Sequence, residues 1–103
     1  MTSLPPFLQE LQGHDAEFVE RVAAIREQAC YVAGALPVKT KLLIALALDI
    51  AHGSATGVRL LSQRARDAGA TDAELMDVLK VCYSVGGMQA LSDGAAAVTQ
   101  EAG

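Results

Sequence analysis

The sequence has few aromatic residues and few cysteines, and both shortages restrict what the protein can be. It contains no Trp, two Tyr and two Phe, although 51% of its residues are hydrophobic. We therefore predict an aliphatic core of Ala, Leu, Val and Ile. Two cysteines, Cys30 and Cys82, are too few for a disulfide framework. The first residues have neither a basic nor an apolar signal segment, so we expect a cytoplasmic location.

Basic residues and long apolar runs are also scarce. Eight Lys and Arg residues stand against twelve Asp and Glu, which gives a net charge of -4. No Lys/Arg cluster is present that could neutralise a row of phosphates, so we expect no nucleic-acid partner. The longest nearly apolar stretch, residues 42–51, is about half of the roughly 20 residues that span a bilayer, and Asp49 interrupts it. We expect no membrane association.

The chain length limits the number of cores. A chain of 103 residues corresponds to one ordinary domain. Its mean hydropathy of +0.28 is high for a domain with so small an interior. We therefore expect part of the apolar surface to be covered by further copies of the same chain.

The first half of the sequence predicts two helices. Gly13 breaks the chain after the Pro5–Pro6 opening, and Asp15 can cap a long helix that ends at Gly34. The apolar residues of this helix recur at helical spacing: Phe18, Val22, Ile25, Ala29 and Val32. Pro37 suits the first turn of a second helix, which Gly53 ends. Residues 42–48 are apolar on every side, and we expect neighbouring subunits to cover part of this helix.

The second half predicts three more helices. Ser54 can cap a helix with Val58, Leu61 and Ala65 inward and Arg59, Arg64 and Arg66 outward. Thr71 and Glu74 have the spacing of a capping box. The helix after them places Leu75, Met76, Leu79 and Cys82 inward, and Gly86–Gly87 ends it. The last segment, residues 88–100, faces inward through Leu91, Ala95 and Val98. No strand pattern is present, so we predict an all-α bundle of about five to six helices.

These segments together resemble a known family. Residues 39–48 (KTKLLIALAL), the break at Gly53, residues 65–75 (ARDAGATDAEL) and the closing Gly86–Gly87 resemble the carboxymuconolactone decarboxylase family, which includes the AhpD-type alkylhydroperoxidases. The resemblance covers roughly residues 36–98. It implies an AhpD-like helical domain, here residues 15–103 after an N-terminal arm of residues 1–14. It also implies a homo-oligomer, either a trimer or a hexamer.

The resemblance does not extend to the thiol chemistry of the family. AhpD-type members carry a Glu in the buried helix, a Cys-x-x-Cys after the break and a His four residues later, which together reduce peroxide. The corresponding residues here are Leu42, Ser54 and Gly57, and Leu61. The decarboxylase branch of the family relies on a segment with His and Arg after the break, where this sequence offers only Arg59.

Polar residues near the Gly53 break form a candidate site. Asp49 and His52 are three residues apart and share a helix face. A carboxylate beside an imidazole can fix its tautomer and allow acid–base catalysis. In the alternative interpretation, Asp49 pairs with an Arg or a helix terminus and His52 binds terminal carbonyls. Three residues follow within two turns as candidate binding residues: Ser54, Thr56 and Arg59. Tyr83 either donates its hydroxyl to this pocket or spans a subunit contact.

The remaining chemical groups predict no metal or other cofactor. One Asp with one His provides two ligands, whereas a protein metal site uses three or four. We expect His14 to lie at the surface, and Met76 and Met88 to fill core positions. Cys82 shares an apolar helix face with Leu75 and Leu79, where a thiol stays neutral.

Three functions remain open at this stage. The first is an oligomer without the cysteine pair that binds or transforms a small organic molecule by acid–base chemistry, as a lyase or isomerase would. The second is a non-catalytic assembly protein. The third is residual alkylhydroperoxidase activity through Cys82 alone. The scaffold does not decide among them, because function resides in the site.

Overall fold

The computed structural model describes residues 4–99, which form six helices and no strand. The helices are α1 (Pro6–Gln12), α2 (Ala16–Cys30), α3 (Val38–His52), α4 (Ala55–Asp67), α5 (Asp72–Gly86) and α6 (Met88–Thr99). This confirms the predicted all-α fold class. Within the described range, no helix is long and apolar enough to cross a membrane.

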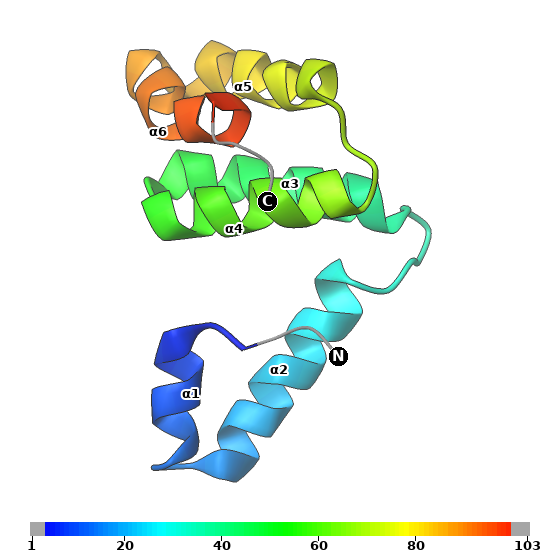
Figure 1. The fold of residues 1–103 in the computed structure, drawn as a ribbon, viewed down its shortest axis with the longest axis vertical. Coiled ribbons are helices and arrows are strands. Elements are labelled where there is room, and N and C mark those ends of the chain that lie inside the picture. Colours follow the sequence, from blue (N-terminus) through cyan, green and yellow to red (C-terminus); the bar gives the residue numbers. More distant parts are fainter. Residues whose placement is uncertain (1–3, 100–103) are drawn as a thin grey trace.

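The six helices form two parts (Figure 1). Helices α3 and α4 make one layer of a four-helix bundle, and α5 and α6 make the other. Helices α1 and α2 pack against each other as a hairpin that extends away from the bundle and meets it at α3. The boundary expected between residues 14 and 15 falls at the turn between α1 and α2.

Helix ends occur where the local sequence places capping groups. The Asp15 carboxylate accepts a hydrogen bond of 3.1 Å from the Phe18 amide at the start of α2. At the start of α5, the Thr71 hydroxyl accepts from the Glu74 amide at 3.1 Å, and the Glu74 carboxylate accepts from the Thr71 amide at 2.9 Å. Gly87, with φ 76°, separates α5 from α6. These boundaries confirm the predictions, because each depends on residues within one turn.

The core lies between the two layers and contains one face of α3. Leu42, Leu46 and Ile50 of this helix are at most 1% exposed. They pack with buried residues of the other bundle helices: Val58, Ala65, Ala70, Leu75, Leu79, Ala90 and Ala97. The opposite face of α3 is uncovered in the single chain, where Ile44 is 46% exposed and Leu48 is 56% exposed. The neighbours within the chain thus cover only part of this apolar helix.

The inward face of α6 differs from the prediction by one residue. Ala90, Gly94 and Ala97 are buried, whereas Ala95 is exposed and Leu91 and Val98 are half-buried at the edge of the core. Small residues are required on this face because a Cβ at position 94 would lie 3.1 Å from Ile50 Cδ1 and 3.2 Å from Leu79 Cγ. The close packing of α6 against its neighbours therefore leaves room on its inward face for small residues only.

Three further predictions about side-chain orientation were wrong. Met76 is 37% exposed and Met88 is 71% exposed, so neither fills the core. Arg66, predicted to point outward, has a side chain only 17% exposed, and its guanidinium lies 2.7 Å from the Asp72 carboxylate. The same guanidinium donates to the carbonyl oxygens of Ala97 and Val98 at the end of α6, at 3.2 and 3.5 Å. Arg66 thus joins α4 to α6, since helix carbonyls at a C-terminus attract cations.

Candidate acid–base site at the α3–α4 junction

The turn between α3 and α4 forms through local backbone requirements. Gly53 adopts a left-handed conformation with φ 72°, which ends α3. The Ser54 amide donates to the Asp49 carbonyl at 3.0 Å, and the Ser54 hydroxyl accepts from the Gly57 amide at 3.3 Å. Both predicted signals, the Gly53 stop and the Ser54 cap, are confirmed. The turn places the last residues of α3 beside the first turn of α4.

The Asp49 side chain occupies the space left by the missing side chain of Gly57. A Cβ atom built at residue 57 would lie 2.0 Å from Asp49 Oδ2 and 2.9 Å from Ser54 Oγ. No side chain larger than hydrogen fits there without displacing the carboxylate. The resemblance implied that residue 57 replaces the second cysteine of the AhpD-type motif. In this chain, Asp49 takes up the space where that side chain would begin.

Two effects act in opposite directions on the pKa of the Asp49 carboxyl. Burial raises the pKa of the Asp49 carboxyl above its ordinary value of 3.8, and the nearby positive charge of His52 lowers that pKa. The desolvation effect is the larger. His52 therefore lies close enough to act electrostatically on the Asp49 carboxyl.

The remaining predicted site residues, together with His52, differ in exposure and in the helix that carries them. His52 is the last residue of α3 and is exposed, as are Thr56 and Arg59 in the first turns of α4. Tyr83 lies on α5 with 46% of its surface exposed and lines neither of the cavities described below. The α3–α4 turn thus gathers five of the six predicted residues, and Tyr83 belongs to another helix.

Positions of the thiol-peroxidase pattern serve structural roles here. Leu42 is buried, and Leu61 packs half-buried against the core. Cys30 and Cys82 are free thiols on α2 and α5. Cys82 Sγ lies 3.8 Å from the Ala47 carbonyl oxygen, and burial raises the pKa of this thiol. A raised pKa keeps the thiol protonated and weakly nucleophilic near neutral pH.

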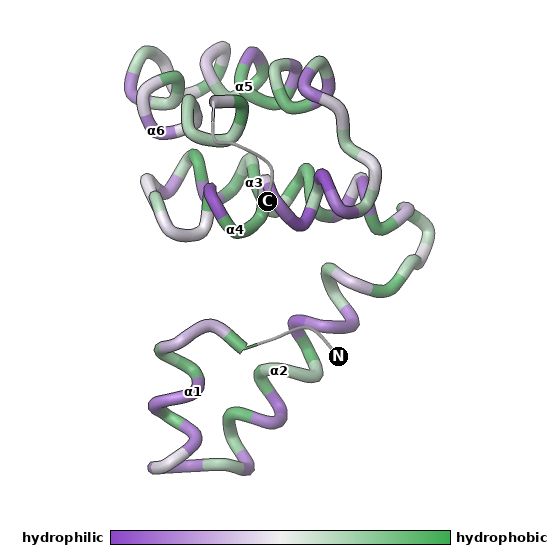
Figure 2. The backbone as a smooth tube through the Cα atoms, in the orientation of Figure 1, coloured by the Kyte–Doolittle hydropathy of each residue, from purple (hydrophilic) through white to green (hydrophobic). Residues whose placement is uncertain are grey.

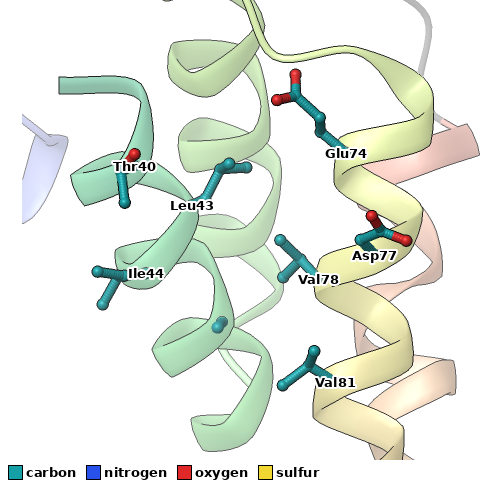
Figure 3. A pocket seen from close by; sticks show the side chains of 8 residues that line it. Thr40, Leu43, Ile44, Glu74, Asp77, Val78 and Val81 are labelled. Atoms are coloured by element: carbon teal, nitrogen blue, oxygen red, sulfur yellow. The ribbon is translucent and has the colours of Figure 1, made fainter. Parts of the chain in front are cut away.

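Two adjoining cavities lie outside the predicted site, along one groove between α3 and α5. The first, about 400 Å³, lies between Thr40, Leu43 and Ile44 on α3 and Glu74, Asp77, Val78 and Val81 on α5 (Figure 3). The second, about 380 Å³, continues from Ala47 and Val81 to Asp93 on α6. Sequence reasoning missed this groove. The only available signal was the row of apolar residues on the outer faces of α3 and α5.

Asp93 is a further carboxylate that the sequence did not indicate. Its Oδ1 accepts from Gln89 Nε2 at 2.9 Å, and its Oδ2 would lie 3.6 Å from a Cβ at Gly53. Asp93 therefore sits against the turn that positions Asp49, from the side of α6. Within residues 4–99, no group of three or more His, Cys, Asp or Glu side chains is arranged as a metal site.

Comparisons with known proteins agree with this architecture. Residues 16–101 match the model of the carboxymuconolactone decarboxylase family. A protein from Burkholderia xenovorans LB400 that bears the name carboxymuconolactone decarboxylase is 28% identical to this chain. Its crystal structure superimposes on this structure with a TM-score of 0.85, and the match covers 94% of this chain and 76% of that chain. A carboxymuconolactone decarboxylase family protein from Legionella pneumophila is 30% identical to this chain and superimposes on it with a TM-score of 0.81. The match covers 88% of this chain and 80% of that chain. No curated protein matches. The chain belongs to the carboxymuconolactone decarboxylase family.

Proposed function

We propose that this protein binds a small organic acid at the α3–α4 junction and transforms it by acid–base chemistry, as a lyase or isomerase. The observation that carries the proposal is the partly buried Asp49 carboxylate, which lies over Gly57 with a raised pKa and beside His52. A carboxylate with a perturbed pKa beside an imidazole is typical of sites that move protons near neutral pH.

The neighbouring residues are suited to hold an anionic substrate. Arg59 offers a guanidinium that can bind a carboxylate through two hydrogen bonds. The Ser54 and Thr56 hydroxyls lie at the start of α4, where backbone amides and the helix dipole favour negative charge. The family name refers to the decarboxylation of a lactone acid. We infer that the substrate is a small carboxylic acid with a carbonyl or lactone group near the reacting carbon.

The proposed reaction needs only groups that can donate and accept a proton, which Asp49 and His52 provide. When a carbon–carboxylate bond breaks, carbon dioxide leaves and the electron pair stays on the substrate carbon as an enolate. A general acid then donates a proton to that carbon, and either Asp49 or His52 can supply it. In an isomerisation, the same pair removes a proton at one carbon and returns it at another. Neither course requires a thiol or a metal-bound nucleophile.

Residual peroxidase activity through Cys82 is the less favoured alternative. A thiol peroxidase needs a thiolate that attacks the peroxide and a second thiol that resolves the product. Burial raises the pKa of Cys82, and Cys30 lies on a different helix.

The cytoplasmic location remains part of the proposal. Its support is the presence of two free thiols, which are typical of a reducing compartment.

The test compares site variants with a matched carboxylate variant. Small keto acids, hydroxy acids and unsaturated lactone acids are screened for binding by ligand-observed NMR, and any binder is followed for proton exchange and carbon dioxide release. We expect Asp49→Asn and His52→Gln each to lower turnover at least tenfold, in line with the usual effect of a general acid or base. The control, Asp77→Asn, removes an exposed carboxylate on α5 and leaves turnover unchanged.

Two results would contradict the proposal. One is turnover that survives both site variants. The other is a complete absence of binding across the panel, combined with an ordinary pKa for Asp49 in the native protein. The latter result would favour the non-catalytic assembly interpretation.

A further inference from the structure

Arg64 on α4 is a partly buried cation whose side chain lacks an acceptor. Helical spacing predicts an outward side chain at this position, yet the residue is half-buried and its Nε atom is buried. Within residues 4–99, neither Nε nor the two terminal nitrogens of this guanidinium have a hydrogen-bond or ion-pair partner. A buried donor without an acceptor destabilises a folded protein, so its presence in a native structure requires an explanation.

The acidic residues that follow Arg64 in the chain are bound to other groups. Asp67 Oδ1 accepts from Gln63 Nε2 at 3.0 Å. Asp72 lies 2.7 Å from one terminal nitrogen of Arg66, and the other terminal nitrogen of Arg66 donates to carbonyl oxygens of α6. Arg66 also has a buried Nε without an acceptor, but the rest of its guanidinium is bonded. The Arg64 guanidinium is therefore the one of these two that can receive a separate ligand.

Arg64 lies on the side of α4 that faces α3. Asp49 of α3 packs over Gly57, so Gly57 marks this side of α4. Arg64 follows Gly57 by seven residues, which places it about 20° from Gly57 around the helix axis and about 10.5 Å along it. Arg66 follows by nine residues and lies on the opposite side, in agreement with its bonds to α6. Asp49 and Arg64 therefore flank one face of the α3–α4 layer.

The surface between these two charged groups is apolar. Leu61 lies one turn from Gly57 and one turn from Arg64, and it packs half-buried against the core. Figure 2 shows hydrophilic segments in the second half of α4 and hydrophobic segments along α3 beside it. Because the Cα–Cβ bonds of a helix tilt toward its N-terminus, the Arg64 side chain starts in the direction of Gly57, which shortens the gap to Asp49. A small molecule can span the remaining distance.

Arg59 is the other arginine near the α3–α4 turn, and it belongs to a different side of α4. It follows Gly57 by two residues, which places it about 160° away around the helix axis. Arg59 is also exposed. It is thus placed to meet a ligand from the far side of the first turns of α4, whereas Arg64 is the arginine on the side of Asp49.

We infer that Arg64 binds the carboxylate of the substrate and orients its reacting carbon toward Asp49. A guanidinium donates from Nε and one terminal nitrogen to the two oxygens of a carboxylate, which supplies the acceptor that Arg64 lacks. The separation along α4 places this carboxylate a few bonds away from the carbon that exchanges a proton. The inference rests on the proposed function, because it names the residue that selects the acid at that site. Arg64 is a binding residue and transfers no proton.

A structural role at the end of α4 would also explain an arginine here, and stability measurements separate the two roles. Arg64 lies in the last turn of the helix, where a cation can interact with free carbonyl groups. If that interaction is its role, Arg64→Met lowers the midpoint of thermal unfolding, as Arg66→Met does through the loss of its bonds. For a ligand-binding residue, Arg64→Met removes an unbonded buried donor, and we expect an equal or higher midpoint. A midpoint lowered as much as in Arg66→Met would overturn the inference.

The binding test follows Arg64 in the full-length protein by NMR, with benzoate as the probe. Benzamide has nearly the same shape without the charge and serves as the ligand control. We expect benzoate, and not benzamide, to shift the Nε–H resonance of Arg64. Benzoate should bind at least tenfold more weakly to Arg64→Gln, with an intermediate affinity for Arg64→Lys, which keeps the charge but not the paired donors. The matched control Arg21→Gln removes an exposed arginine of α2 and leaves the affinity unchanged.

The two proposals fail in different ways in this experiment. An Arg64 resonance that benzoate does not move would overturn the inference about Arg64, as would benzoate binding that is weakened by Arg59→Gln and not by Arg64→Gln. Either result leaves the acid–base role of Asp49 and His52 untouched, because turnover tests that role separately. If benzoate binds through Arg64 but Asp49→Asn and His52→Gln both retain turnover, the anion site stands and the acid–base proposal fails.

Discussion

Replacement of Gly57 by Ala tests whether the Asp49 carboxylate is fixed over the start of α4. Gly57 is the third residue of this helix, and at such a position Gly→Ala ordinarily stabilises a protein by about 0.5–1 kcal/mol. Here the new Cβ would lie 2.0 Å from Asp49 Oδ2 and 2.7 Å from Asp49 Cγ. Crowding of this kind costs about 1–3 kcal/mol. We therefore expect a net loss of about 1 kcal/mol in the free energy of unfolding.

The double variant separates crowding from helix propensity. In an Asp49→Ala background the obstruction is gone, so Gly57→Ala should stabilise the protein by about 0.5–1 kcal/mol. The sign of the Gly57→Ala effect thus reverses between the two backgrounds. Urea unfolding followed by circular dichroism, at one fixed protein concentration, measures all four proteins of the cycle.

A second readout reports on Asp49 itself. In Gly57→Ala the carboxylate must move toward solvent, so its raised pKa should fall toward the ordinary value of 3.8. Carboxyl chemical shifts measured by NMR against pH follow this change directly. A Gly57→Ala protein that is more stable than its parent, with the Asp49 pKa unchanged, would refute the packing of Asp49 over Gly57.

Two further predictions follow from the site and from the helix caps. Because burial raises the pKa of Asp49 in the folded state, the folded protein binds this proton more tightly than the unfolded chain, and stability from this group falls as pH rises through the range just above 3.8. Asp49→Asn should remove that slope in urea unfolding measured between pH 4 and pH 8, and an unchanged slope would contradict it. Thr71→Ala removes the hydroxyl that accepts from the Glu74 amide, while the backbone amide of residue 71 can still donate to the Glu74 carboxylate. The substitution should cost about 1 kcal/mol, measured by thermal unfolding with the exposed Thr99→Ala as control. Equal stability of the two Thr variants would argue against the capping box as a stabilising element.

Most residues of the candidate site could be predicted from the sequence, but the contact between Asp49 and Gly57 could not. Asp49 and His52 could be placed on one helix face from their spacing alone, and Ser54 could be assigned as a cap from its position after Gly53. The packing of Asp49 against Gly57 depends on the angle at which α4 leaves the turn. That angle results from contacts between the two helices, which no short sequence window contains.

The sequence by itself determined the helices and most of their ends. Asp15, Gly53, Ser54 and the Thr71–Glu74 pair act on backbone groups within one turn, so their effect needs no partner elsewhere in the chain. The breaks at Gly53, Gly69 and Gly87 likewise follow from backbone conformations with positive φ, which favour glycine. These local requirements were sufficient to predict an all-α chain.

Only the tertiary structure decided which face of each helix is covered. The spacing of Phe18 and Ile25 identifies an apolar face on α2, yet this face lies open because the hairpin extends away from the bundle. On α6, the small residues around Gly94 face inward because Ile50 and Leu79 already fill the space beside them. Periodicity shows that a helix has an apolar face. Whether that face is buried depends on residues distant in the chain, which hold or fail to hold another helix against it.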